Sequence, residues 1–398
     1  MRFRLSREGI HFLGVLLFIF VGAVIREINL LLLLAGAMIG LLMLQWRFNT
    51  RTLRGLSIHH QLPRHVTAAQ SIEVNCEITN PKRLLGAWLV SVEDGLRVIE
   101  PRGRKLTRRG TAVVDEIPPS GRAQAQYQLT FSRRGKYRLG PSTLSTRFPI
   151  GLGLGWRIID TAQDIYVHPQ RGELLPRASQ LLYPEQEGSR KSSSSAGVHE
   201  AEFFGLRPWA TGDSKRWIHW RTTARLGELA VRQFEKQQRQ QICVLLDLYS
   251  EQTNNVDPMV ELAISFAATM ASEIAMQARD NLSISVAGRR LYTASHIQSP
   301  VLLGNLLDEL AVVEPSQTPD LMGALHELSK PLLSNPFLIV VSTRPSKQTD
   351  LKELVGQPKR AQDRLMQRIL TRLQVRWLNV SNGEVSGYWT PPTVESAI

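Results

Sequence analysis

Two apolar runs near the N-terminus form the strongest hydrophobic pattern of the chain. Residues 10–25 contain one titratable side chain, and residues 28–46 contain none. At 1.5 Å per residue the second run would extend about 28 Å as a helix, close to the hydrocarbon thickness of a bilayer. The first run is shorter, but the flanking Arg7 and Arg26 can reach the headgroups with their long side chains. We therefore predict a transmembrane helical hairpin within residues 1–56.

Arginines flank this hairpin at the ends opposite its turn. They are Arg2, Arg4 and Arg7 before the first run and Arg47, Arg51 and Arg54 after the second. Because positive residues next to membrane spans face the cytoplasm, we predict that both ends of the hairpin and everything after it are cytoplasmic. The two cysteines, Cys76 and Cys243, are compatible with a reducing compartment. The expected location is the bacterial inner (cytoplasmic) membrane, with two spans and with cytoplasmic N- and C-termini.

In residues 57–170, hydrophobic and polar positions alternate with a period of two, as in β-strands. Short segments that alternate, or are rich in Val, Ile, Tyr and Thr, are separated by turns that contain Pro or Gly. The pattern predicts about six or seven antiparallel strands in a sandwich or a barrel, and we take a β-sandwich as the prediction. A glycine-rich string at 151–156 looks like a nucleotide-binding loop, but a strand-like segment follows where a phosphate loop needs a helix. We interpret this string as a turn between strands.

The remaining chain changes character twice. Residues 171–200 are poor in apolar positions and rich in serine, which indicates a linker or a long surface loop. Over residues 241–398, apolar runs of strand length alternate with helical patterns, a sign of a parallel, doubly wound α/β sheet. Helices are predicted over 258–279, 301–313, 321–333 and 362–373. In such sheets functional loops follow the strand ends, and here those loops carry Asp247, Thr343 and Asn382.

The net charge of +13 is unevenly distributed. It is +5 over residues 1–56, +7 over 57–170, +4 over 171–240 and −3 over 241–398. Most early basic residues flank the hairpin, and no stripe of Lys and Arg recurs on a predicted helix. We therefore expect the lipid bilayer as a partner and no nucleic acid. Two cysteines far apart in the sequence also exclude a disulfide scaffold and a clustered cysteine zinc site.

Residues 201–240, the signature segment, hold three of the eight tryptophans among interleaved basic residues. Gly212 would permit a tight turn, and Asp213 could cap a following helical turn or pair with an arginine. Trp217 and Trp220, three residues apart, would share one helix face. Three interpretations compete: a nucleic-acid or lipid patch, an acid–base site built on Asp213 and His219, and a structural clamp that doubles as a partner surface. We favour the last, because no nucleophile, second carboxylate or metal cluster accompanies the acid–base pair.

The signature segment resembles a motif of the bacterial family named domain of unknown function 58. That motif reads Arg-x-x-x-x-Gly-Asp-x-x-Arg-x-Ile-His/Asp-Trp-x-x-x-Ala-Arg. It is matched here by Arg207, Gly212, Asp213, Arg216, Ile218, His219, Trp220, Ala224 and Arg225. Residues 133–141 and 147–155 also resemble segments that precede the motif in the family. The resemblance implies a von Willebrand factor A-like domain after the motif. It also implies an association with a MoxR-type AAA+ ATPase and, often, with transglutaminase-like membrane proteins.

Von Willebrand factor A domains commonly hold Mg²⁺ through Asp-x-Ser-x-Ser, a Thr and a second Asp, ligands that suit a hard cation. The corresponding positions here carry Asp247, Tyr249, Glu251, Thr318 and Arg344. Two serines are replaced, and a guanidinium cannot ligate a cation. We predict no metal at this degenerate site, no other cofactor, and a pair between the Asp247 carboxylate and Arg344.

The leading functional prediction is a membrane-anchored, non-catalytic scaffold or adaptor. It would work with a MoxR-type ATPase in the assembly or maturation of protein complexes, or in envelope functions. The alternatives are an enzyme that uses Asp213 and His219, and a cell-envelope adaptor that acts through the β-domain alone.

Overall fold

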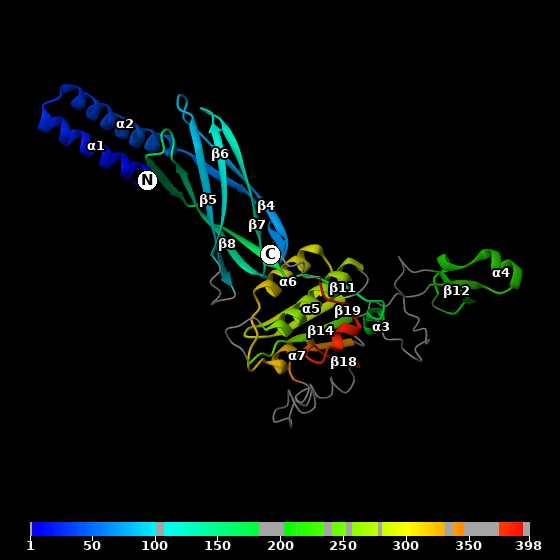
Figure 1. Ribbon diagram of the computed structural model, residues 1–398. Helices are drawn as coiled ribbons and strands as arrows, with labels where there is room; N and C mark the ends of the chain where they lie inside the picture. The colour runs from blue at the N-terminus through cyan, green and yellow to red at the C-terminus, as the bar shows by residue number, and fades with distance from the viewer. Residues whose placement is uncertain are drawn as a thin grey trace.

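The computed structural model describes residues 2–100, 107–182, 203–211, 213–234, 241–251, 257–277, 281–330, 337–345 and 374–392. Gly212, the predicted helix over 362–373 and most of the predicted serine-rich linker lie outside these residues. Figure 1 shows a helical hairpin at one end, long strands in the middle and a sheet covered by helices beyond them.

The hairpin consists of α1 (Arg7–Arg26) and α2 (Asn29–Leu53). The Ser6 side chain caps α1 by accepting a hydrogen bond from the backbone N–H of Gly9, at 3.0 Å. Both helices are long and apolar enough to cross a membrane, and most of their apolar side chains are exposed. A third helix of that length and composition, α5 (Pro258–Gln277), is instead largely buried within the protein. The two predicted N-terminal apolar helices are confirmed, which indicates a membrane protein.

Both ends of the hairpin attach to one strand, β9 (Gly153–Ile159). Before α1, β1 (Arg2–Leu5) pairs antiparallel with β9. At the other end, the fully buried amides of Gln45 and Asn49 on α2 donate hydrogen bonds to the Gly153 carbonyl, at 3.2 and 3.0 Å. Neither β1 nor this junction was predicted. The N-terminal end of α1 and the C-terminal part of α2 therefore both lie next to β9.

The glycine-rich string is therefore part of a strand, and our interpretation of it as a turn was wrong beyond residue 152. A Cβ atom on Gly153 would overlap the Phe3 ring of β1, and one on Gly155 would lie 2.9 Å from the Cβ of Asn49. Glycine allows the hairpin to approach the strand this closely.

The middle of the chain forms two sheets. Their strands are β2 (Ser57–Gln61), β3 (His65–Thr67), β4 (Ser71–Thr79), β5 (Ala87–Glu100), β6 (Thr107–Ile117), β7 (Arg122–Thr130), β8 (Gly135–Thr146), β9 and β10 (Gln163–His168). One sheet contains β1, β3, β5, β6, β8, β9 and β10, and the other has the order β2-β4-β7. Inward side chains of both sheets share one hydrophobic core. The prediction of a wholly antiparallel arrangement was wrong in one detail, because β3 runs parallel to β10.

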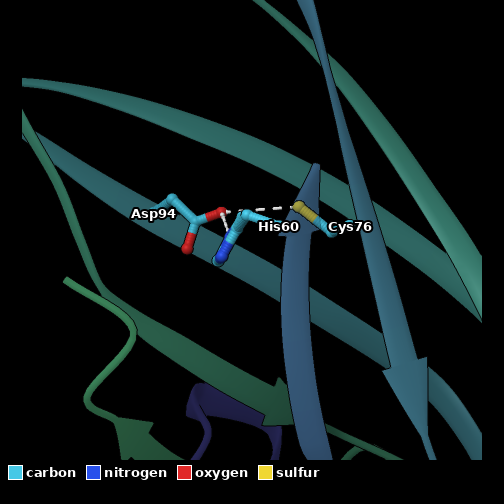
Figure 2. Close-up of side chains that lie close together, drawn as sticks. All are labelled: His60, Cys76 and Asp94. Atoms are coloured by element: carbon cyan, nitrogen blue, oxygen red, sulfur yellow. Dashed lines mark hydrogen bonds and ion pairs between the residues drawn. The ribbon is translucent and has the colours of Figure 1, made fainter. Parts of the chain in front are cut away.

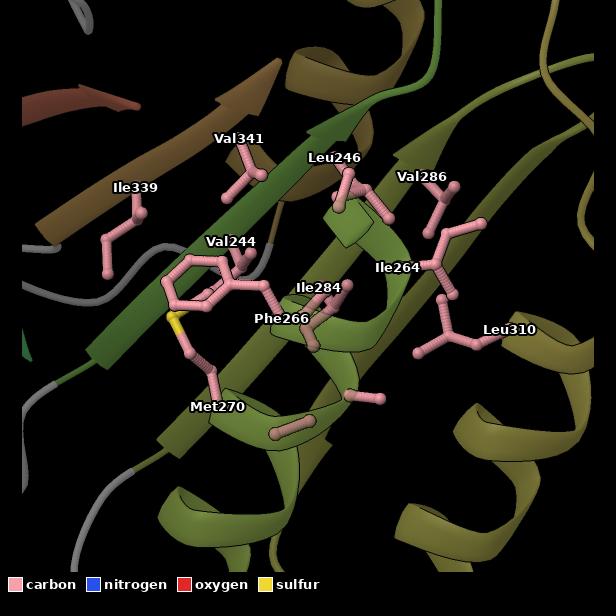
Figure 3. Packing of buried hydrophobic residues seen from close by; sticks show 14 of the residues in the cluster. Val244, Leu246, Ile264, Phe266, Met270, Ile284, Val286, Leu310, Ile339 and Val341 are labelled. Atoms are coloured by element: carbon pink, nitrogen blue, oxygen red, sulfur yellow. The ribbon is translucent and has the colours of Figure 1, made fainter. Parts of the chain in front are cut away.

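The C-terminal part contains a five-stranded sheet in the order β16-β15-β14-β17-β18. Its strands are β14 (Gln241–Asp247), β15 (Asn281–Ala287), β16 (Leu291–Ile297), β17 (Phe337–Ser342) and β18 (Gln374–Asn379), all parallel except β16. The helices are α5, α6 (Pro300–Val312) and α7 (Leu321–Ser329). Every residue of β14 and β15 is buried. The continuous apolar run of β14 agrees with this burial, whereas β15 also buries Ser283 and Ser285. In Figure 3, Ile264, Phe266 and Met270 of α5 lie against strand residues of this sheet.

The predicted linker begins too early in the sequence. Strand β11 (Glu173–Leu174) pairs with β19 (Trp389–Thr390), and the helix α3 (Ala178–Leu182) follows it. Leu181 and Leu182 are buried in the core of the five-stranded sheet. Two adjacent leucines in a polar context gave too weak a signal to place this segment from sequence.

Candidate functional site

The signature residues form a small unit of their own. This signature unit, residues 203–211 and 213–234, is an antiparallel pair of β12 (Phe203–Pro208) and β13 (Ala230–Phe234) joined through two short helices. The helices are a 3-10 turn (Lys215–Trp217) and α4 (Trp220–Leu226), which ends at Gly227 in the left-handed region (φ 74°). Figure 1 shows the unit set apart from the large sheets.

Arg207 and Asp213 close the first loop of the signature unit. Two guanidinium nitrogens of Arg207 donate to the two carboxylate oxygens of Asp213 at 2.7 and 2.6 Å, and the Ala210 N–H donates to the same carboxylate at 2.9 Å. The guanidinium lowers the pKa of Asp213, so the carboxylate is ionised. Asp213 therefore pairs back toward β12, and the expectation that it caps the following helical turn was wrong.

Trp217 and Trp220 do not share a helix face. Between them, Ile218 leaves the helical conformation and forms an isolated β-bridge to Val231, where both side chains are buried. Trp217 ends the 3-10 turn and is partly buried, whereas Trp220 begins α4 and is 66% exposed. Residues three apart share a face only within a continuous helix, and here the pairing of Ile218 with Val231 interrupts the helix between the two tryptophans.

His219 and Asp213 have different partners. The His219 backbone N–H donates to the Ala230 carbonyl at 2.8 Å, and its Nδ1 lies 2.8 Å from the Thr222 hydroxyl. These contacts place His219 at the start of α4 and orient its ring within the unit. The structure thus describes no hydrogen bond between the two residues of the predicted acid–base pair.

The outer surface of the signature unit combines apolar and cationic side chains. Leu226 is 66% exposed, as much as Trp220, although both belong to a helix of seven residues. Other exposed side chains of the unit include Leu206, Trp209, Lys215, Arg216, Arg221, Ala224, Arg225, Glu228, Leu229 and Arg232. We call Trp220, Leu226, Leu229, Arg221 and Arg225 the exposed face. Aromatic and Arg side chains are enriched among residues that dominate protein–protein binding.

The second candidate site lies at the ends of β14 and β17, where the order of the five-stranded sheet reverses. The Asp247 carboxylate is completely buried and accepts hydrogen bonds from Arg344 Nε at 2.7 Å and from the Ser342 hydroxyl at 2.8 Å. Burial raises the pKa of Asp247, and the Arg344 guanidinium and the Ser342 hydroxyl oppose that rise. The structure contains the ion pair that the strand ends predicted.

The other predicted positions have no described hydrogen bond to the Asp247 carboxylate. The Arg344 guanidinium lies over the Tyr249 ring, with its central carbon, Cζ, 5.4 Å from the ring centroid. Glu251 accepts a hydrogen bond from the Tyr249 hydroxyl, and Thr318 is exposed and donates its backbone N–H to Ser316. Arg344 thus donates to both carboxylate oxygens of Asp247.

Comparison with known families matches residues 205–363 to the model described as "Protein of unknown function DUF58". The resemblance to the DUF58 family is therefore confirmed. The match includes the signature unit and the strands β14 and β17, and thus both candidate sites. It does not extend to the hairpin or the two-sheet region. A comparison with curated proteins finds no match.

Solved structures similar to parts of the chain lie at low TM-scores. One is a superoxide reductase (Neelaredoxin) variant from Ignicoccus hospitalis, with 12% identity and a TM-score of 0.19 over 30% of this chain and 85% of that chain. Another is the CARDB domain of a Pyrococcus furiosus protein, with 13% identity and a TM-score of 0.18 over 28% and 91%. These values support no conclusion about fold or function.

Outside the DUF58 match, the structure reveals a buried polar cluster that the sequence analysis missed (Figure 2). Asp94 of β5 accepts hydrogen bonds on one carboxylate oxygen from His60 Nε2 at 2.9 Å and from the Tyr127 hydroxyl at 2.5 Å, and the Cys76 thiol lies 3.8 Å from it. Burial raises the pKa of Cys76 to about 12. Burial alone would also raise the pKa of Asp94, but the His60, Ser142 and Tyr127 side chains hold it below its ordinary value.

This cluster connects the two sheets, because Asp94 belongs to the larger sheet and the three donors belong to β2, β4 and β7. An acidic residue at an inward position of a period-two pattern was the available signal in the sequence.

Proposed function

We propose that the chain is a membrane-anchored, non-catalytic scaffold whose signature unit binds a MoxR-type AAA+ ATPase. The observation that carries this proposal is the exposed face of the signature unit. A helix of seven residues that leaves both Trp220 and Leu226 two-thirds exposed gains little from folding alone. A partner that buries this face would recover that apolar area and would meet the guanidinium groups of Arg221 and Arg225 with its own acidic side chains.

The anchor supports a scaffold fixed to one side of a membrane. Because β1 and α2 both end on β9, the N-terminus and the large domains share one side of the bilayer. Positive charge at Arg2, Arg4 and Arg47 favours the cytoplasmic side of the bacterial inner membrane for both termini. In that position a soluble cytoplasmic ATPase has direct access to the signature unit.

Two finer fold assignments belong to the same proposal. We infer that the C-terminal domain is von Willebrand factor A-like, because helices accompany a parallel sheet with one antiparallel edge strand, β16. We infer that the two sheets between the hairpin and this domain form a β-sandwich, because they share one core. The Asp247–Arg344 pair supports a domain that acts by binding and not through a metal ion, since the fixed positive charge of Arg344 would repel a cation.

The test is site-specific crosslinking in native membranes. A photo-reactive amino acid at position 220 should capture a MoxR-type ATPase, and the same probe at Leu84, which is 96% exposed on the two-sheet region, should not. Trp220→Ala and Leu226→Ala should each reduce recovery of the ATPase in a pull-down, while Leu84→Ala leaves it unchanged. All three side chains are exposed, so the fold should be retained.

Recovery of no AAA+ ATPase in either ATP or ADP would refute the proposal. Equal recovery by all three variants would refute the assignment of the exposed face. Capture of a transglutaminase-like membrane protein at position 220 would replace the ATPase by another partner of the same surface.

A further inference from the structure

A cluster of two imidazoles and a carboxylate lies where the two-sheet region meets the α/β domain. His65 belongs to β3 and His168 ends β10, and the parallel pairing of these strands places the two rings next to each other. Their centroids are 4.9 Å apart with an interplanar angle of 24°. Asp308, on α6 of the other domain, approaches both rings with the same carboxylate oxygen, 2.7 Å from His168 Nε2 and 3.2 Å from His65 Nδ1.

The three groups have the donor types and spacing of a transition-metal site. One ligand atom from each lies within 4.8 Å of the other two. Zinc binds imidazole nitrogen and carboxylate oxygen at about 2.0–2.2 Å, so ligand atoms around one tetrahedral ion are roughly 3.3 Å apart. The Asp308–His65 distance of 3.2 Å already matches that separation, and the Asp308–His168 distance of 2.7 Å is shorter by about 0.6 Å. Imidazole ligands favour zinc over magnesium or calcium, which prefer oxygen alone.

Exposure differs among the three ligands in a way that suits an ion with an open coordination position. The His168 side chain is largely buried, whereas the His65 side chain is 47% exposed. An ion held between them would therefore retain contact with solvent for a fourth ligand and for entry. The buried cluster around Asp94 offers neither, because His60, Cys76 and Asp94 are enclosed and the donors already converge on one oxygen.

We propose that His65, His168 and Asp308 bind one zinc ion that links the two-sheet region to helix α6. The ion would join α6 to β3 and β10 at Asp308, four residues before the helix ends at Val312. Arg134 already holds this last turn by hydrogen bonds to the Leu310 and Ala311 carbonyls. Zinc would thus add a second connection between the two-sheet region and the same helix. This inference is independent of the proposed ATPase partner.

The experiment uses the full chain in detergent after treatment with a chelator. Titration calorimetry with ZnCl₂ should give one ion per chain, and His65→Gln and Asp308→Asn should each weaken binding at least about 100-fold, since even loss of a second-shell partner typically costs about 10–100-fold. His59→Gln is the matched control, because His59 is exposed on β2 and close in sequence. His65→Gln leaves the His168–Asp308 hydrogen bond in place, and circular dichroism checks that each variant is folded.

Cobalt distinguishes this site from the buried cluster. Co²⁺ bound by two imidazoles and a carboxylate gives visible absorption without a thiolate-to-metal charge-transfer band. Such a band, lost in Cys76→Ser, would place the metal at the Asp94 cluster and overturn the proposal. Absence of zinc binding, or equal binding by His59→Gln and His65→Gln, would overturn it as well.

Discussion

Arg134 connects the two large domains more extensively than any other single side chain that the structure describes. It directly precedes β8, and its side chain is 2% exposed. Its Nε and Nη2 donate to the Glu261 carboxylate of α5 at 2.9 and 3.2 Å. Its Nη1 donates to the carbonyls of Leu310, Ala311 and Val313 at 2.8, 3.0 and 3.0 Å. Arg134 therefore acts as a C-terminal cap of α6 that is supplied by the neighbouring domain.

Replacement of Arg134 by Met preserves much of the apolar stem and removes all five hydrogen bonds. The α6 carbonyls lose their partners, the helix C-terminus loses a cation, and Glu261 loses its ion pair. Removal of one partner of a buried ion pair typically costs about 3–5 kcal/mol. Glu261 is nearly a third exposed and can be rehydrated, so we take the lower end, about 3 kcal/mol. At about 1.4 kcal/mol per tenfold change, this corresponds to a change on the order of 100-fold in a local opening equilibrium.

Hydrogen exchange measured by mass spectrometry on the full chain in detergent is the appropriate assay, because a chain of several domains need not unfold in one step. Peptides that cover the last turn of α6 should exchange on the order of 100-fold faster in Arg134→Met than in the wild type. Arg133→Met is the matched control, since Arg133 is adjacent and exposed. Equal exchange in the two variants would refute the role of Arg134 as a cap between domains.

Three further substitutions test the structure elsewhere. Asp94→Asn should flatten the acid side of the curve of unfolding free energy against pH. The pKa of Asp94 is lowered in the folded chain, so its contribution to stability is present above about pH 4 and is lost as the pH falls through the pKa of the folded state. An unchanged curve would contradict this. Gly153→Val should force the Phe3 ring away and detach β1 from β9, at a cost of about 1–3 kcal/mol, seen as loss of amide protection in residues 2–5 but not in the five-stranded sheet. Arg344→Met should lower the free energy of unfolding of the α/β domain by about 3–5 kcal/mol, because it leaves the Asp247 carboxylate unpaired in a buried site. Adding Asp247→Asn should restore part of that loss. No restoration would contradict an ion pair between the two residues.

The hairpin illustrates how far the sequence could be read. Its two helices were predictable because an uncharged apolar run long enough to cross a bilayer rarely forms anything other than a helix. Its attachment was not, because four residues before a span carry no usable periodicity, and Gln45 and Asn49 look like an ordinary polar end of a helix. Their partners are carbonyls of residues about 100 positions away. Only the glycines of β9 indicated a close approach of two backbones, and a glycine-rich string can equally indicate a turn or a loop.

At the candidate sites, too, some features could be predicted from the sequence and others could not. The Asp247–Arg344 pair was predictable because parallel strands place their C-terminal ends at one edge, so register alone brings the two residues together. The helix face of Trp217 and Trp220 was not, because the bridge of Ile218 to Val231 is a contact between positions 13 residues apart. Local spacing cannot report such a contact. The His65–His168–Asp308 cluster depends on three elements from two domains and left no local pattern at all.

A continuous series of contacts connects the hairpin to α6. Strand β1 and the amides of α2 hold β9, β9 pairs with β8, and β8 begins directly after the arginine that caps α6. Sheet pairing and a buried ion pair resist displacement far better than a solvated linker does. These contacts therefore restrict the orientation of the α/β domain relative to the hairpin. If a partner acts on the domain that carries Asp247, the force is transmitted through Arg134 and β8 to both ends of the membrane hairpin. Weakening Arg134 should consequently loosen this connection without abolishing it, because the His168–Asp308 hydrogen bond still joins β10 to α6.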